Sequence, residues 1–226
     1  IELNQPNEVI LTYINKYPRR KKQITILQDL LQQGKILKST YSSPQLNDLI
    51  TDGLVKVIKE QIYRINNEQQ TTKAPSLTLD QQTAIAQVRL MKEQTYLLHG
   101  VTGSGKTEVY MQLITKVLEN NQTALMLVPE ISLTTQIINR FYSRFGSDVA
   151  IFHSALSDGE KYDEYLKILR DEVKIVIGTR SAIFTPIKRL GIIIIDEEHS
   201  ETYKQDTTPR YHALDMAKFR SHYNHI

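Results

Sequence analysis

Cysteine is absent from the 226 residues of this sequence. Its absence excludes a disulfide framework and a thiolate zinc site, fits a reducing compartment, and leaves oxygen ligands for any metal. Long apolar runs are missing too, since none approaches the roughly 20 residues of a membrane-spanning helix, and no charged-then-apolar leader opens the chain. We therefore expect a globular, cytoplasmic protein with no membrane partner.

The sequence also carries little excess charge. Its formal net charge of +3 does not by itself argue for a polyanionic partner, and its 40% hydrophobic content is enough to bury a core. The distribution is uneven, because five cations crowd around a proline near the start: Lys16, Arg19, Arg20, Lys21 and Lys22. Such a run is either a patch that attracts phosphate or the solvated start of a helix, and both interpretations stay open.

Two helices are predicted in the first part of the chain. Apolar residues at helical spacing predict one over residues 20–33, which Gly34 ends. A second is predicted over residues 43–53, with Ser43 as its N-cap. This second helix has no lysine or arginine and carries two aspartates, so it is poorly suited to reading bases.

Two short strands are expected next, over residues 54–58 and 62–65, joined by a turn at residues 60–61. Helices followed by a small hairpin resemble a winged-helix module. We therefore predict a small α+β winged-helix-like domain over residues 1–66. Residues 67–76 lack large apolar side chains and contain a proline, which is typical of a linker.

From residue 77 to residue 226, apolar runs rich in β-branched residues alternate with helical patterns. This alternation predicts an α/β lobe with a parallel sheet covered by helices on both faces. Five strands are predicted, over residues 96–99, 124–128, 149–152, 174–177 and 191–195.

Residues 100–107 read GVTGSGKT and match G-x-x-x-x-G-K-[ST] at every position. The glycines allow a tight turn whose backbone N–H groups point at a phosphate, and the following helix directs its positive dipole end at the same anion. Lys106 is expected to reach the β- and γ-phosphates, and the Thr107 hydroxyl to hold Mg²⁺. The alternative is a chance flexible loop, but an apolar run before it and a helical pattern after it favour a nucleotide site. The predicted nucleotide contacts are Gly100, Val101, Thr102, Gly103, Ser104, Gly105, Lys106 and Thr107.

Two adjacent carboxylates, Asp196 and Glu197, follow the apolar run at residues 192–195. They are expected at the carboxyl edge of the sheet, where open parallel sheets bind ligands. Asp196 would hold Mg²⁺, and Glu197 would orient and deprotonate the attacking water. An isolated pair of this kind is often a solvated strand end, but together with the glycine-rich turn it favours nucleotide hydrolysis.

Residues 196–199 read DEEH, which has the form of the D-E-x-H box of superfamily 2 helicases. Most of the chain from residue 77 onward resembles the primosomal replication-restart helicases of that superfamily. The segments that carry the resemblance are LTLDQQTAI (77–85), LLHGVTGSGKTEVY (97–110), PEISLTTQ (129–136), FHSALSDGEKYDE (152–164), IVIGTRSAIFTP (175–186), IIIIDEEHSETYKQ (192–205) and PRYHALDMA (209–217).

The resemblance implies a RecA-like lobe that uses ATP and Mg²⁺, in an ATP-dependent 3′-to-5′ DNA helicase acting in replication restart and primosome assembly at stalled forks. It implies single-stranded and forked DNA as partners, together with primosome proteins and single-strand-binding proteins. It also implies a bacterial, nucleoid-associated location. A double-stranded DNA translocase and a non-catalytic DNA-binding or interaction fragment remain the alternatives.

The resemblance also implies individual roles. Gln81 would read the adenine edge and His199 would couple the nucleotide site to DNA, although each fits an ordinary polar residue as well. The residues expected to contact DNA are Thr134, Gln136, Thr179, Arg180, Ser181, Tyr203, Lys204, Arg210 and Tyr211. Arg180 could instead pair with a nearby carboxylate, and Tyr203 and Tyr211 could pack beneath the lobe.

Parts of the complete family pattern are absent from this sequence. We expect a lobe truncated before the S-A-T coupling motif and the second lobe, and we expect zinc only in parts of the full protein absent here. Because the second lobe normally supplies a transition-state arginine, the fragment should bind nucleotide weakly and hydrolyse it negligibly. The histidines His153, His199 and His212 show no ligand spacing.

Overall fold

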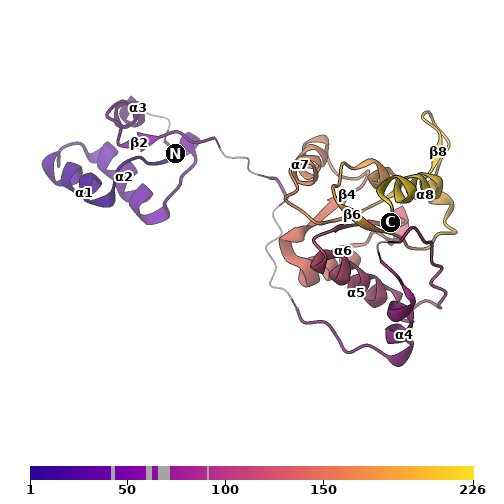
Figure 1. Ribbon diagram of the computed structural model, residues 1–226. Coiled ribbons are helices and arrows are strands. Elements are labelled where there is room, and N and C mark those ends of the chain that lie inside the picture. Colours follow the sequence, from indigo (N-terminus) through magenta and orange to yellow (C-terminus); the bar gives the residue numbers. More distant parts are fainter. Residues whose placement is uncertain (42–43, 60–62, 66–71, 91) are drawn as a thin grey trace. The chain divides into compact units, whose positions relative to one another are not determined.

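The computed structural model describes residues 1–41, 44–59, 63–65, 72–90 and 92–226. The chain divides into two compact units, Ile1–Ile62 and Tyr63–Ile226 (Figure 1). Each unit has an apolar core of its own.

The first unit is built mainly from helices. The helix predicted over residues 20–33 is confirmed, and Gly34 (φ +75°) ends it in the left-handed conformation. A preceding helix, which was not predicted from the sequence, packs beside it through the fully buried Ile10. Ser43, the predicted N-cap of the next helix, lies outside the described residues. The elements are β1 (Glu2–Leu3), α1 (Asn7–Lys16), α2 (Lys21–Gln33), η1 (Lys38–Thr40), α3 (Pro44–Thr51) and β2 (Val55–Lys56).

The predicted hairpin after α3 is replaced by a different pairing. β2 pairs antiparallel with β1 from the start of the chain, with Leu3 opposite Val55. Residues 63–65 form no strand, because the Arg64 N–H donates to the Asp163 carboxylate (2.9 Å) within the second unit instead of to a ladder partner. The expected turn at 60–61 and the start of the second strand at residue 62 lie outside the described residues. The winged-helix assignment of residues 1–66 stays a prediction.

The second unit contains a parallel four-stranded sheet, as predicted for an α/β lobe. Its strand order is β4-β5-β3-β6, and every neighbouring pair is parallel. The predicted strands at residues 124–128, 149–152, 174–177 and 191–195 are confirmed. Their observed bounds are β3 (Thr123–Leu127), β4 (Val149–Phe152), β5 (Ile175–Gly178) and β6 (Leu190–Ile195).

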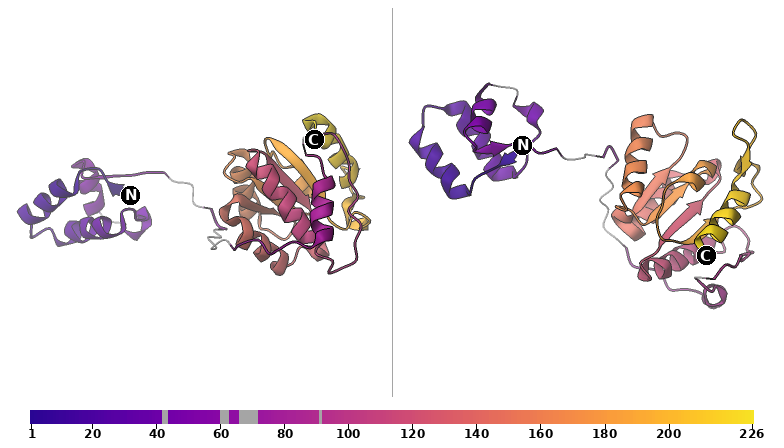
Figure 2. Two further views of the ribbon diagram at one scale, coloured as in Figure 1. Left: turned by 60° about the horizontal axis from the view of Figure 1, so that its bottom comes forward. Right: turned by 45° about the horizontal axis from the view of Figure 1, so that its top comes forward.

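Helices cover both faces of this sheet (Figure 2). Successive side chains of β3 alternate between the two cores: Met126 faces α5 and α6, whereas Leu125 and Leu127 face α7 and α8. Both layers are apolar, so each strand reads as a continuous hydrophobic run. The helices of this unit are α4 (Leu79–Gln87), α5 (Lys106–Glu119), α6 (Thr135–Phe145), α7 (Asp158–Leu169) and α8 (Ala213–Asn224).

The strand predicted over residues 96–99 is wrong. Within the described ranges β6 pairs with β3 alone, and no strand lies along its other edge. Neighbouring side chains do alternate between solvent and core, since Leu97 is 77% exposed whereas Leu98 packs against the core. A strand also needs a partner for its N–H and C=O groups, and residues 96–99 have none among the described strands.

Loops at the carboxyl edge of the sheet carry the remaining elements. Because the strands are parallel, the segments that follow β3, β5 and β6 all leave from this edge. They contain η2 (Glu130–Ser132), η4 (Arg180–Phe184), η5 (Glu201–Tyr203) and an antiparallel hairpin of β7 (Lys204–Gln205) and β8 (Tyr211–His212), while η3 (Gly146–Asp148) precedes β4. In the residues that the structure describes, no helix combines the length and apolarity needed to cross a bilayer.

Candidate functional site

The glycine-rich turn at residues 100–107 leads directly into α5. Gly103 (φ +81°) and Gly105 (φ +86°) adopt left-handed conformations that other residues rarely take. The Lys106 ammonium donates to two carbonyls of the same turn, Gly100 O at 2.7 Å and Val101 O at 3.2 Å. The side chain of Lys106, the first residue of α5, therefore folds back onto the turn that precedes it.

Gln81 reaches this turn from α4. Its side chain accepts a hydrogen bond from Thr78 N–H (2.9 Å) and donates to Gly105 O (3.4 Å). Thr78 and Gln81 together form a capping box at the start of α4. A Cβ on Gly105 would force the Gln81 amide to move, and the positive φ of Gly105 (+86°) disfavours a side chain there in any case. Contact between Gln81 and adenine stays a prediction.

Asp196 follows the last residue of β6 and is held by both its main chain and its side chain. Its N–H donates to Leu127 O (2.9 Å), and its carboxylate accepts a hydrogen bond from Tyr110 of α5 (3.1 Å). Burial, together with the charge of Asp196, raises the pKa of Tyr110. The phenol therefore keeps its proton and remains a donor to Asp196.

Glu197 and His199 lie beyond Asp196 on an exposed turn. Glu197 has φ +50°, and its carboxylate lies 3.6 Å from His199 Nε2. The other ring nitrogen of His199 lies 3.4 Å from Glu198, and the His199 side chain is 77% exposed. Glu197 is thus open to solvent, and His199 touches only the acidic residues of its own segment among the contacts that the structure records.

The glycine turn and the acidic strand end border one cavity of about 850 Å³. Its lining includes Gly100, Val101, Thr102 and Lys106 of the turn together with Glu197, Glu198 and His199, and most of the remaining lining is apolar. Tyr110 lies one helical turn after Lys106 and bonds to Asp196, so it joins the two halves. A turn with backbone N–H groups and an ammonium, at the same cavity as carboxylates, suits an anion bridged by a cation.

The donor set fits Mg²⁺ in particular. In the described residues no group of three histidines or acidic residues could hold a metal alone. Mg²⁺ does not need such a cage, because it is commonly bound by one or two carboxylates together with waters and substrate phosphates. Thr107 and Asp196 are therefore compatible with a metal that arrives with a nucleotide.

Several residues predicted to contact DNA lie on the surface of the loops and helix ends. Thr134 is exposed and caps α6 by accepting a hydrogen bond from Ile137 N–H (3.4 Å), and Gln136 is exposed in the first turn. Ser181 is half-buried in η4. These positions leave their predicted DNA contacts open.

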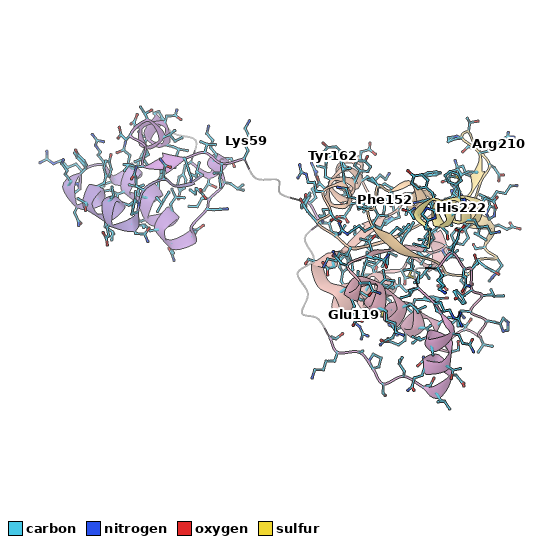
Figure 3. The ribbon with its side chains drawn as sticks, in the orientation of Figure 1. Lys59, Glu119, Phe152, Tyr162, Arg210 and His222 are labelled. Atoms are coloured by element: carbon cyan, nitrogen blue, oxygen red, sulfur yellow. The ribbon has the colours of Figure 1, made fainter. Side chains whose placement is uncertain are left out.

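The hairpin of β7 and β8 presents the other candidates. Arg210 is exposed and lies on this hairpin in Figure 3. Lys204 pairs with Asp206 (3.0 Å), and Tyr211 packs edge to face against Phe184 with ring centroids 4.8 Å apart. The ring contact therefore joins Phe184 of η4 to the hairpin that carries the exposed Lys204 and Arg210.

Three other residues predicted to contact DNA are buried or bonded within the lobe in this structure, and their contact with DNA stays a prediction. Tyr203 is fully buried, and its hydroxyl bonds to Asp196 O (2.6 Å) and Leu127 O (3.1 Å), so no ring face is left for a base. Thr179 is only 3% exposed at the end of β5. Arg180 donates to the carbonyls of Thr202 and Lys204, at 3.1 Å each, and therefore holds the base of the hairpin.

Tyr110 and Glu108 also belong to this region, and neither was predicted from the sequence. Glu108 is 5% exposed and pairs with Arg144 (3.3 Å) and Arg140 (3.6 Å) of α6, which fixes α5 against its neighbour. Tyr110 could have been found from its spacing, because residues four apart on a helix share a face. Its partner Asp196 could not, because 86 residues separate them.

A parallel sheet that carries a glycine turn before a helix and acidic residues at a strand end defines an α/β P-loop lobe of the RecA-like class. Residues 78–222 match the DEAD/DEAH box helicase family. Since the match covers more than half of the chain, the chain belongs to the DEAD/DEAH box helicase family.

Within this family, the chain is similar to two replication restart proteins. The chain is 50% identical over 194 residues to replication restart protein PriA of Bacillus subtilis (strain 168), covering 83% of this chain and 24% of that protein. It is 46% identical over 199 residues to PriA of Synechocystis sp., and this match covers 86% of this chain and 23% of that protein. The resemblance to replication-restart helicases is thereby confirmed, and the chain spans about a quarter of the length of these relatives.

Among solved structures, the UvsW helicase from bacteriophage T4 matches with a TM-score of 0.46 and 18% identity, over 69% of this chain and 52% of that chain.

Proposed function

We propose that this chain is the nucleotide-binding lobe of an ATP-dependent 3′-to-5′ DNA helicase that acts in replication restart and primosome assembly at stalled forks. The observation that carries the proposal is the shared cavity between the glycine turn and the DEEH segment, joined by the Tyr110–Asp196 hydrogen bond. Membership of a helicase family supports the motor role, and the PriA relatives support the pathway. Polarity, forked and single-stranded DNA, primosome and single-strand-binding proteins, and a site of action near the bacterial nucleoid follow from that likeness.

The residues of the cavity can divide the work of ATP hydrolysis. Lys106 exchanges the carbonyls of Gly100 and Val101 for phosphate oxygens, while N–H groups of the turn donate to the same phosphates. Thr107 and Asp196 would hold Mg²⁺, which would supply positive charge to the nucleotide phosphates. Glu197 accepts a proton from water as the water oxygen attacks the γ-phosphorus. The bond from that phosphorus to the bridging oxygen breaks, and ADP and phosphate leave.

The isolated chain should bind ATP but hydrolyse it negligibly. In related enzymes the arginine that stabilises the transition state accelerates the reaction by about 10³–10⁵, and it belongs to a second lobe in helicases of this kind. The full-length protein should displace a strand from forked DNA. A duplex translocase would consume ATP on the same substrate without separating its strands.

The direct test replaces Lys106 with alanine and measures binding of a fluorescent ATP analogue with Mg²⁺. Loss of a charge-assisted hydrogen bond to phosphate should weaken binding by about tenfold or more. Lys116→Ala is the matched control, because Lys116 is an exposed lysine on the same helix α5. Equal affinity of Lys106→Ala and the unmodified chain, with both folded by circular dichroism, would remove the nucleotide site from the proposal.

A further inference from the structure

The buried carboxylate of Glu108 has two arginine partners, one more than its charge requires. Its Oε1 accepts hydrogen bonds from Gln112 (3.0 Å) and from Arg144 (3.3 Å), whose side chain is 11% exposed. Arg144 alone therefore supplies the counter-charge that a buried carboxylate needs. Arg140 lies 3.6 Å from Oε2, beyond the length of a charge-assisted hydrogen bond, and its side chain is 48% exposed. The packing of α5 against α6 thus does not explain this second cation.

Arg140 lies on a face of α6 that starts at the carboxyl edge of the sheet. α6 follows β3 and η2, and Gln136 precedes Arg140 by one helical turn on the same side of the helix. Gln136 and Arg140 are both exposed, whereas Arg144, one turn further along, is nearly enclosed against Glu108. A ligand that runs along the carboxyl edge can therefore reach Arg140 but not Arg144.

The groups on this part of α6 suit a nucleic-acid backbone. Thr134, Gln136 and Arg140 offer a hydroxyl, an amide and a guanidinium within the first two turns. The Thr134 oxygen accepts from Ile137 N–H, and its own O–H can still donate. Such a mixture is typical of contacts to phosphate and sugar rather than to base edges. A guanidinium also binds a phosphate through two parallel hydrogen bonds, a better geometry than the longer pair with Glu108.

Glu108 ties Arg140 to the helix that follows the nucleotide turn. It lies in the first turn of α5, where its N–H donates to Gly105 O (3.0 Å). A half-exposed ion pair contributes little stability, so a phosphate can displace the Glu108 carboxylate from Arg140. Displacement leaves Glu108 paired with Arg144, and no buried charge is left alone.

We propose that Arg140 contacts a phosphate of single-stranded DNA and pairs with Glu108 when no DNA is bound. This contact rests on the proposed function, because DNA would lie along the predicted contacts Thr134 and Gln136. Arg140 lies beyond the segment at residues 129–136, so it adds a contact from the second turn of α6.

The first test compares the whole chain with Arg140→Gln. Fluorescence anisotropy follows binding of labelled oligo(dT) across a series of salt concentrations. One lost phosphate contact on a single strand lowers the slope of log affinity against log salt by about 0.7. Raising salt from about 50 to about 200 mM should then cost the unmodified chain about 2.6-fold more affinity than the variant. Arg170→Gln is the matched control and should keep the original slope, because Arg170 is 46% exposed and lies 4.0 Å from Glu172 at the end of α7.

A double-mutant cycle tests the pairing with Glu108. Glu108→Gln removes the competing charge and keeps an oxygen for Arg144, so DNA affinity should rise by about threefold, the size of a half-exposed ion pair. In the Arg140→Gln background the same change should leave DNA affinity unaltered. If Glu108 only packed the two helices together, its substitution would change DNA affinity by the same factor in both backgrounds. Arg140→Gln alone tests the DNA contact if Glu108→Gln does not fold.

An unchanged salt slope in Arg140→Gln, or equal factors in the two backgrounds, would overturn the proposal. Binding of the fluorescent ATP analogue is measured on the same proteins. If the analogue binds and Lys106→Ala weakens that binding while Arg140→Gln keeps the full slope, the Arg140 contact fails and the proposed function stands. If the unmodified chain binds neither the analogue nor oligo(dT), the proposed function fails and the Arg140 contact fails with it.

Discussion

The hydroxyl of Tyr110 provides the sharpest probe of the nucleotide site. It donates to Asp196 Oδ1 at 3.1 Å, and the tyrosine is only 7% exposed. Tyr110→Phe removes this one oxygen and keeps the ring in place. A hydrogen bond to a charged group contributes about 1.5–3 kcal/mol. The main chain of Asp196 stays bound to Leu127 and to the Tyr203 hydroxyl, so only the carboxylate loses its orientation.

Loss of a residue that orients a metal ligand typically weakens metal binding by about 10–100-fold. We expect the lower end, about tenfold, because the Asp196 backbone is still held. The assay titrates Mg²⁺ at fixed ATP analogue and follows nucleotide binding. Tyr110→Phe should need about tenfold more Mg²⁺, and its affinity measured without Mg²⁺ should be unchanged.

Tyr165→Phe serves as the control, since Tyr165 is 40% exposed on α7 and belongs to neither side of the cavity. If Tyr110→Phe lowers the free energy of unfolding but leaves the Mg²⁺ requirement unchanged, the phenol merely packs α5 against the sheet. Its assignment as the residue that positions Asp196 would then be refuted.

Two further predictions concern Tyr203 and His153. Tyr203→Phe should lower the free energy of unfolding by about 1–2 kcal/mol, because the Asp196 carbonyl loses its buried hydroxyl donor, whereas Leu127 O keeps the Asp196 N–H. Chemical denaturation measures this loss, and reduced DNA affinity at unchanged stability would favour the DNA-stacking role instead. Burial lowers the pKa of His153, whose Nδ1 accepts a hydrogen bond from Ala155 N–H (3.2 Å). The folded state therefore favours the neutral His153 ring. This contribution to the free energy of unfolding is present above the ordinary histidine pKa and is lost as pH falls through the lowered pKa. Between about pH 7 and about pH 5 the unmodified chain should lose more stability than His153→Gln, and parallel losses would contradict this assignment.

The features that the sequence predicted correctly are those set by neighbouring residues. The turn at residues 100–107 depends on Gly103 and Gly105, whose positive φ values are a local property of the chain. β3 and β5 are likewise marked by their own unbroken apolar runs. Both kinds of feature can be predicted without knowing what lies beside them in space.

The errors concern features that depend on distant partners. β2 pairs with β1 more than fifty residues earlier, whereas the sequence suggested an adjacent hairpin. Residues 96–99 have the pattern of a strand but no neighbour to pair with among the described strands. For Tyr203 the sequence left DNA contact and packing beneath the lobe both open, and the structure places it beneath the ends of two strands. Such outcomes depend on register and packing, which a single sequence does not encode locally.

The Tyr203 hydroxyl also explains how the two halves of the carboxyl edge stay together. It lies within hydrogen-bond distance of Leu127 O, at the end of β3, and of Asp196 O, just after β6. Asp196 N–H donates back to Leu127 O, so the two strand ends cannot separate without breaking a buried network of three contacts. β3 leads directly into residues 129–136, the segment predicted to meet DNA, and β6 leads into the predicted metal ligand. A displacement of Asp196 would therefore move the start of that segment, because packed and hydrogen-bonded elements shift together rather than deform.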